Sequence, residues 1–273
     1  LGIRGEPGTP DIPAQGKVWS SIVQLLPKHN EESEYVSVVT QERSAYVQHP
    51  WSVGGGGASE LKDKLDRVSH VNLGKLAKEI GRTTVVGHDD AWIFPKENAV
   101  RNGIEASTYT FVVGENVRDW KLSKCEVAIF PYESLGSNKV LDRLPAFTHQ
   151  MLWPNRSILQ TRTVFGKTLK DREEPWYVHL ENYSEKLATP LSITFAFVAT
   201  QNHFVLDRGG KVFNRTAPVI KLPAGASEAE HSALLGLLNS STACFWGRQT
   251  FFGRGGFSDG KWQERVEWDG TKL

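Results

Sequence analysis

Three segments of the chain combine an excess of basic side chains with nearby glycine. Residues 155–172 carry five Arg or Lys against one acid, residues 201–222 four against one, and residues 247–265 four against two. Arginine can donate two hydrogen bonds to guanine, Lys and Arg neutralise phosphates, and glycine lets a loop approach a duplex closely. Each residue alone also fits a solvated turn, but the clustering favours double-stranded DNA. The predicted DNA contacts are Arg208, Lys211, Arg215, Arg254, Lys261, Arg162 and Lys167.

Other chemical patterns in the chain have simpler interpretations. Glu60-Leu61-Lys62 has the Glu-x-Lys spacing of a metal-dependent nuclease, but it falls in a predicted helix, where an exposed pair is expected. His88-Asp89-Asp90 could bind a metal, yet no second group of ligands lies near it in sequence, so a polar turn is expected. We therefore predict neither a metal site nor a catalytic residue.

Four consecutive glycines, 54–57, precede a predicted helix, as phosphate-binding loops do. The run lacks the Lys-Ser/Thr ending of a P-loop and the spacing of a dinucleotide fingerprint. We interpret it as a hinge, with contact to the DNA backbone and nucleotide binding as alternatives.

The bulk composition is that of an ordinary globular protein. The chain has 273 residues, 39% of them hydrophobic and 23% charged, and a formal net charge of +1. This length can bury one large core or two modest ones, and the charge gives no global attraction to nucleic acid. No apolar run approaches the length of a membrane span, and no signal peptide is recognisable. The two cysteines, Cys125 and Cys244, fit a reducing cytoplasm.

Hydrophobic periodicity predicts helices near the N-terminus and strands in two later regions. Helices are expected over 18–26 and 58–68, a strand over 35–39, and a helix from Leu73 to Ile80 closed by Gly81. β-Branched runs predict strands within 83–131 and 191–222, whereas 140–187 should be mostly helical.

An apolar helix should lie near the end of the chain. Ser227 and Glu230 form a capping-box pattern at its start, and Leu234 to Trp246 place apolar residues around most of its faces. We therefore expect this helix to be buried.

Several of these segments, in this order, resemble the target recognition domains of DNA methyltransferases and restriction–modification proteins. They cover about 75–246. The matching segments are Leu73–Gly81, Val112–Trp120, Val127–Tyr132, Asn202–Asp207 and the Leu-Asn-Ser-Ser sequence 238–241.

The front of the chain narrows the resemblance. Arg4–Gly8, and His49–Ser52 with the glycine run, are similar to PglX-type adenine methyltransferases of BREX phage-defence systems and to their type IIG restriction–modification relatives. The Asn-Pro-Pro-Tyr/Phe motif and the Gly-rich S-adenosylmethionine loop of those enzymes are absent here. The resemblance thus implies a recognition part without a cofactor of its own, S-adenosylmethionine belonging to a separate catalytic domain. Leu1 at the start and Met151 as the single methionine also suggest a piece of a longer protein.

Together these observations predict an α+β protein. Residues 1–80 would form a helical connector from a missing catalytic domain, and residues 81–273 a DNA recognition domain with a twisted, mostly antiparallel sheet flanked by helices. The expected function is sequence-specific recognition of double-stranded DNA, so that the catalytic domain of the same parent chain can flip out one adenine for N6 methylation.

Three alternatives remain open. A sugar-stacking face of a carbohydrate-binding module could be formed by Trp51, Trp92, Trp120, Trp153, Trp176, Trp246, Trp262 and Trp268. The chain could instead dock other proteins of a defence system, or be a complete enzyme of unknown type. No membrane partner is expected.

Overall fold

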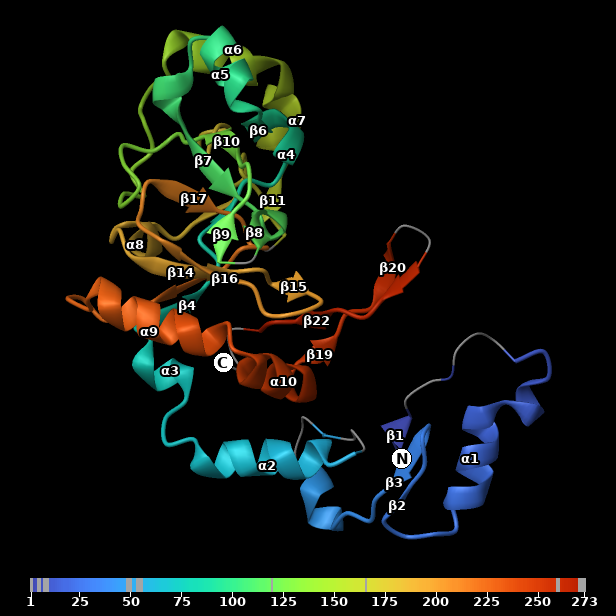
Figure 1. Cartoon of the computed structure of the whole chain (residues 1–273). Helices are drawn as coiled ribbons and strands as arrows, with labels where there is room; N and C mark the ends of the chain where they lie inside the picture. Colours follow the sequence, from blue (N-terminus) through green and yellow to red (C-terminus); the bar gives the residue numbers. More distant parts are fainter. Residues whose placement is uncertain are drawn as a thin grey trace. The chain divides into compact units, whose positions relative to one another are not determined.

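The structure is a computed structural model that describes residues 2–3, 6, 10–47, 51–52, 56–118, 120–164, 166–258 and 261–269 (Figure 1). Only the backbone is described for Gly2, Ile3, Phe257, Ser258, Lys261 and Trp262. The chain divides into two compact units: unit 1 contains 1–71 and 245–252, and unit 2 contains 72–244 and 253–273. The predicted domain boundary at residue 80 therefore falls inside unit 2. The segments 4–5, 7–8, 48–50 and 53–55, which carry part of the predicted family resemblance and hinge, lie outside the described residues.

Unit 1 combines helices with a small antiparallel sheet of order β1-β3-β2. Helix α1 packs on β3, and the Glu6 carboxylate accepts the amide hydrogen of Lys17 at its first turn (2.7 Å). The sequence predicts a helical connector in this region, and the structure contains this sheet in addition to the helices. The elements are β1 (Gly2–Ile3), η1 (Pro13–Gln15), α1 (Lys17–Leu25), β2 (Glu31–Glu32), β3 (Val36–Val38), η2 (Arg43–Tyr46) and α2 (Ala58–Val68). The predicted helix over 58–68 and strand over 35–39 are confirmed.

Unit 2 contains most of the strands. Its first part comprises α3 (Leu73–Leu76), β4 (Glu79–Gly81), β5 (Thr84–Val85), α4 (Asp89–Trp92), β6 (Ile93–Phe94), α5 (Lys96–Arg101), η3 (Glu105–Ser107), β7 (Thr108–Val112), η4 (Gly114–Asn116), β8 (Val117–Arg118), β9 (Lys121–Leu122) and β10 (Glu126–Ile129). Its middle comprises α6 (Ala146–Leu152), η5 (Trp153–Asn155), α7 (Arg156–Gln160), β11 (Thr163–Val164), β12 (Lys167–Thr168), β13 (Glu181–Asn182) and α8 (Ser184–Leu187). Its last part comprises β14 (Ser192–Phe195), β15 (Val198–Ala199), β16 (Phe204–Asp207), β17 (Lys211–Phe213), β18 (Val219–Lys221), α9 (Glu228–Leu238), β20 (Gly256–Ser258), β21 (Lys261–Gln263) and β22 (Val266–Glu267). Helix α10 (Ser241–Thr250) and strand β19 (Phe252–Gly253) contain residues of both units.

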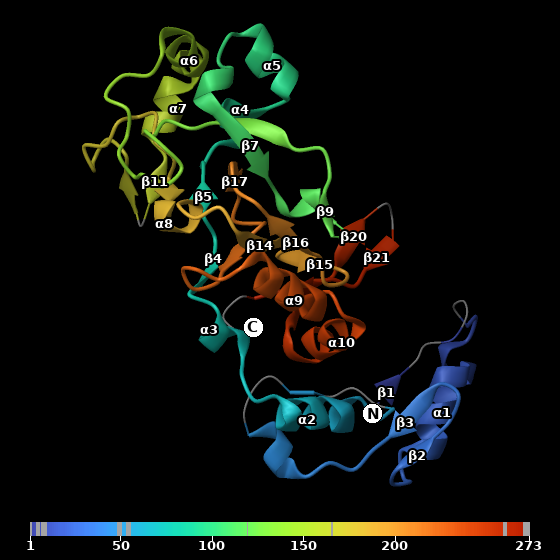
Figure 2. The same ribbon diagram turned by 60° about the vertical axis from the view of Figure 1, so that its left-hand side comes forward.

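Two four-stranded sheets organise unit 2 (Figure 2). The sheet of order β16-β14-β18-β4 is antiparallel throughout, and α9 packs against β16 and β14. The sheet of order β17-β7-β10-β6 is antiparallel except for the β17–β7 pair. Fully buried Phe111, Phe195, Ile193 and Ile220 form part of the core. The predicted α+β class with mostly antiparallel strands is confirmed, although two sheets replace the single one expected.

The predicted helix from Leu73 to Ile80 is wrong in its second half. The helix ends at Leu76, and Glu79–Gly81 pairs with β18 as the edge strand β4. Gly81 is therefore a strand residue with a φ of +151° and not a helix cap. Pairing with a strand 140 residues away overrides the local helical pattern, because a tertiary contact outweighs weak propensity. The region 140–187 likewise contains only short helices among loops and hairpins.

The predicted apolar helix near the C-terminus is two helices. The capping box of Ser227 and Glu230 is confirmed at the start of α9, but α9 ends at Leu238. Only one face of α9 is covered, since Leu237 is 63% exposed. At the break, the Asn239 side chain accepts the Phe204 amide hydrogen (3.0 Å) and donates to the Phe204 carbonyl (2.9 Å). Asn239 thus ties the end of α9 to β16.

No helix of the described residues is long and apolar enough to cross a membrane.

Candidate nucleic-acid interface

Two grooves in unit 2 share one wall. The first has a volume of about 940 Å³ and runs between β4 and the 195–198 segment. The second has a volume of about 980 Å³ and runs between the 85–90 segment and the loops around residues 113–118 and 197–203. The residues lining both grooves are Phe197, Val198, Arg215 and Thr216. The turn that carries Arg215 therefore stands at the junction of the two grooves.

The 214–217 turn is held from several sides. The Asn214 carboxamide oxygen accepts the Thr216 amide hydrogen (3.3 Å), and the Thr216 hydroxyl oxygen accepts the Gly114 amide hydrogen (3.0 Å). The Thr216 carbonyl accepts the amide hydrogen of Phe197 (3.0 Å). A Cβ at Gly114 would lie 2.4 Å from that carbonyl oxygen, so only glycine allows this approach. These contacts fix the backbone that presents Arg215.

Arg215 is exposed and, among the described residues, makes no hydrogen bond or ion pair. The other arginines of the first groove are occupied: Arg82 pairs with Glu181 (2.7 Å) and Arg254 with Glu267 (2.6 Å). Arg215 is therefore available for a ligand without breaking an existing contact.

The second groove is lined by both hydrogen-bond donors and hydrogen-bond acceptors. Arg118 donates to the carbonyls of its own loop, whereas the buried Nε of Arg265 has no partner among the described atoms. His88, Asp89 and Asp90, predicted as a polar turn, also line this groove. Base edges present both donors and acceptors, whereas phosphates present acceptors only. The lining therefore suits base edges better than a run of phosphates.

Arg208 and Lys211, two other predicted DNA contacts, form ion pairs with carboxylates of the chain. Arg208 is exposed, and its guanidinium bonds to Glu228 in the first turn of α9 (2.5 Å). Glu228 also raises the pKa of Arg208. Lys211 binds the buried Asp207 carboxylate (2.6 Å) and the Gly209 carbonyl (3.3 Å). The ammonium of Lys211 thus compensates a buried charge in β16 and is the less accessible of the two.

The structure contradicts the expectation that Arg162 lies on an exposed surface. Arg162 is 7% exposed, and its guanidinium donates to the carbonyls of Val86, Leu159, Trp176 and Val178. Burial lowers its pKa to about 10. Arg162 is a structural cross-link between three segments and is not accessible to a duplex in this structure.

Lys167 and Lys261 are the remaining two predicted DNA contacts. Lys167 is exposed in the β11–β12 hairpin and has no described partner. The side chain of Lys261 lies outside the described residues, although its backbone forms part of β21. Because its ammonium group is exposed, Lys167 remains a predicted DNA contact.

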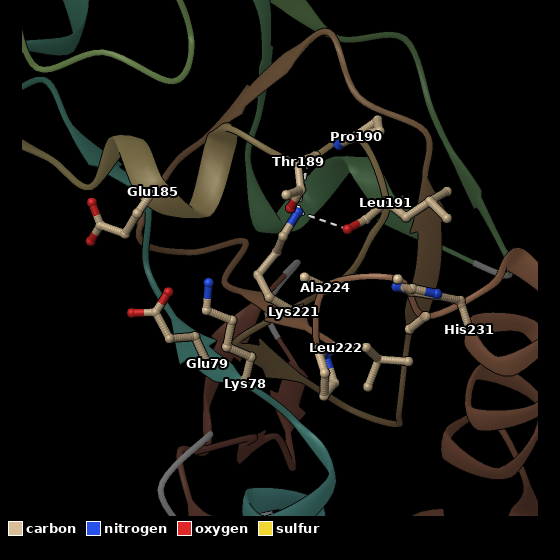
Figure 3. Close-up of a pocket in the computed structure, with 13 residues that line it drawn as sticks. Lys78, Glu79, Glu185, Thr189, Pro190, Leu191, Lys221, Leu222, Ala224 and His231 are labelled. Carbon is tan, nitrogen blue, oxygen red and sulfur yellow. Dashed lines mark hydrogen bonds between the residues drawn. The ribbon is translucent and has the colours of Figure 1, made fainter.

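A smaller cavity of about 260 Å³ contains the amine of Lys221, a residue that no sequence pattern indicates as part of a site (Figure 3). The Lys221 ammonium donates to the carbonyls of Thr189 and Leu191 at 2.7 Å each. Burial lowers its pKa to about 8. The Lys221 side chain thus links β18 to the loop before β14. Glu79 and His231 also line the cavity.

The described residues contain no group of three or more His, Cys, Asp or Glu side chains that could hold a metal ion. Glu60 and Lys62 lie on helix α2, where Lys62 pairs with Asp66 (2.6 Å). The Glu-x-Lys pattern is therefore part of a helix surface.

The chain is similar in sequence to part of an adenine-specific methyltransferase. The relative is adenine-specific methyltransferase PglX of Streptomyces coelicolor, 39% identical over 285 residues. The predicted relationship to PglX-type methyltransferases is confirmed, since the match covers 99% of this chain. It covers 23% of PglX, so the chain spans less than a quarter of the length of this relative.

No family model matches the chain. Among solved structures, the type IIL restriction–modification enzyme MmeI in complex with DNA matches with a TM-score of 0.48 and 13% identity, over 75% of this chain and 25% of that chain.

Proposed function

We propose that this chain is the part of a PglX-type adenine-specific methyltransferase that recognises the DNA sequence. The observation that carries the proposal is the 39% identity with PglX over nearly the whole chain. The two grooves that meet at Arg215, which has no partner among the described residues, support it, because such a surface can bind both the backbone and the base edges of a duplex.

The proposed contacts fall into two groups. Lys167, Arg208 and Arg254 are exposed cations suited to phosphates, and they would set the position of the duplex. Arg215 and the second groove would face base edges. Once the duplex is in register, the catalytic domain of the same parent chain would flip out the target adenine and methylate its N6.

The rest of the parent protein would supply the chemistry. S-adenosylmethionine and the Asn-Pro-Pro-Tyr/Phe motif belong to the catalytic domain in this proposal, and no residue of the present chain is assigned to the cofactor. The biological setting would be phage defence of the BREX type, or restriction–modification, in the cytoplasm. Other proteins of such a system are an alternative partner.

A sugar-binding function gains no specific support from the structure. Two of the Trp considered for a stacking face, Trp92 and Trp268, are 0% and 2% exposed. They belong to the core and cannot stack on a carbohydrate.

Fluorescence anisotropy with the chain and a pool of random duplexes tests the proposal. We expect saturable binding that weakens as the salt concentration rises, since phosphate contacts release counterions. Replacing Arg254 with Gln should weaken it, whereas Lys124→Ala is the matched control, because Lys124 is an exposed cation that lines neither groove. Absence of binding at low salt would refute DNA recognition by this chain.

A further inference from the structure

The junction of the two grooves has a property that general DNA affinity does not require. Phosphate binding needs a positive charge within reach of the backbone, and flexible lysines or arginines supply it. Reading a base needs a planar donor set held in a fixed place, because two hydrogen bonds must form at once. Arg215 supplies such a planar donor set, and the turn that carries it fixes the backbone from which the side chain extends.

We propose that Arg215 reads a guanine in the major groove of the DNA target, through paired hydrogen bonds to guanine O6 and N7. This inference rests on the proposed function, since it names the base that the interface selects. Among the seven predicted contacts, Arg215 combines exposure, absence of a described partner and a place in both grooves.

The contacts on both sides of Arg215 fix the backbone of this turn. Asn214 begins the turn with its amide bonded to the Val112 carbonyl of β7 (2.8 Å) and a bridge to Thr84. Thr216 ends it in bonds to Gly114 and Phe197. The two residues flanking Arg215 are therefore anchored to separate parts of unit 2, and the guanidinium extends from a fixed point.

The surroundings favour a base over a phosphate as the partner of this guanidinium. Asp89, Asp90 and Glu115 line the second groove with Arg215. Carboxylates repel phosphates, but they accept hydrogen bonds from the amino group of cytosine, which is paired with guanine in the duplex. The groove thus combines a donor for guanine with acceptors for its partner base.

Selection from a random duplex pool, followed by sequencing of the bound fraction, tests this assignment. The wild-type chain should enrich one position at which guanine is preferred by about tenfold or more. Arg215→Ala should still bind duplex, through the other cations, but lose the preference at that position alone. Arg215→Gln should shift the position towards adenine, because a carboxamide pairs with adenine N6 and N7.

Lys124→Ala serves as the control for lost charge and should leave the selected sequence unchanged. Thermal unfolding of the Arg215 variants should match the wild type, since the side chain is exposed and has no partner in the part of the chain that the structure describes. The assignment is overturned if Arg215→Ala keeps the same guanine, or if the wild type binds duplex with no base preference. In the first case sequence recognition stands and only the assignment of Arg215 fails. In the second case duplex binding stands but sequence recognition fails, so the proposed function fails with the assignment, as it does for a chain that binds no duplex.

Discussion

At the residue scale, Arg162 and Arg215 differ in the burial of their side chains. Arg162 and Arg215 both lie in basic segments and were both predicted DNA contacts. Arg162 is enclosed by four carbonyls, whereas Arg215 is exposed at the junction of the grooves. No local pattern separates them, because the carbonyls around Arg162 come from residues up to 76 positions away. The basic character of each segment can be read from the sequence, but the accessibility of each side chain cannot.

Arg162 yields a stability prediction. Arg162→Met should lower the free energy of unfolding by about 3 kcal/mol, because it leaves buried carbonyls without donors. Lys167→Met is the matched control and should change it by less than about 0.5 kcal/mol, since Lys167 is exposed and has no described partner. Urea denaturation monitored by Trp fluorescence gives both values. Equal effects would mean that the Arg162 contacts contribute nothing.

His179 should make stability depend on pH. It is 3% exposed, its Nε2 lies 2.9 Å from the Ile129 carbonyl, and burial lowers its pKa to about 3. An unfolded histidine titrates near pH 6.5, so between pH 6.5 and 3 only the unfolded chain takes up the proton, and stability falls as the pH falls. From pH 7 to 5 this loss should be about 2 kcal/mol.

The comparison with His179→Gln isolates this histidine from other titrating groups. Gln keeps a donor for the Ile129 carbonyl but does not titrate. The unfolding free energy of the variant should therefore fall less between pH 7 and 5 than that of the wild type. Parallel pH profiles would rule out His179 as the source.

At the element scale, the sequence predicts what is locally determined. Helix α2 and the capping box of α9 agree with prediction because their signals lie within a few consecutive residues. Strand β4 could not be predicted, since it is a three-residue edge strand defined by a distant partner. The Leu-Asn-Ser-Ser sequence resembles target recognition domains, yet its structural role, Asn239 bound to β16, follows only from the fold.

The turn beneath Arg215 gives a prediction about one element. Gly114→Ala should lower the free energy of unfolding by about 1–3 kcal/mol and weaken DNA binding, because its Cβ would displace the Thr216 carbonyl. Gly236→Ala is the control of opposite sign: Gly236 lies inside α9 with nothing within 4 Å of an added Cβ. It should stabilise the chain by about 0.5–1 kcal/mol. Two equal effects would show that the close approach at Gly114 is not limiting.

At the scale of the whole molecule, the chain is almost neutral, so long-range attraction cannot bring it to DNA. Two of its exposed arginines are moreover paired with carboxylates, Arg208 with Glu228 and Arg254 with Glu267. A phosphate must compete with those carboxylates for the guanidinium. The acids should therefore limit the affinity of the free chain for DNA, and removing one should release its arginine.

Glu267→Gln and Glu228→Gln should each tighten duplex binding by about two- to fivefold at low salt and make it more salt-dependent, because one further phosphate contact steepens the dependence by about 0.9 in the logarithmic slope. Glu133→Gln removes the same charge from a pair with Lys139 that lines neither groove. Net charge rises by one unit in all three variants, so only the position of the charge differs. Anisotropy titrations over a series of salt concentrations distinguish the two causes: an equal gain in Glu133→Gln would assign the effect to net charge, whereas a gain confined to the other two would assign it to the released arginines.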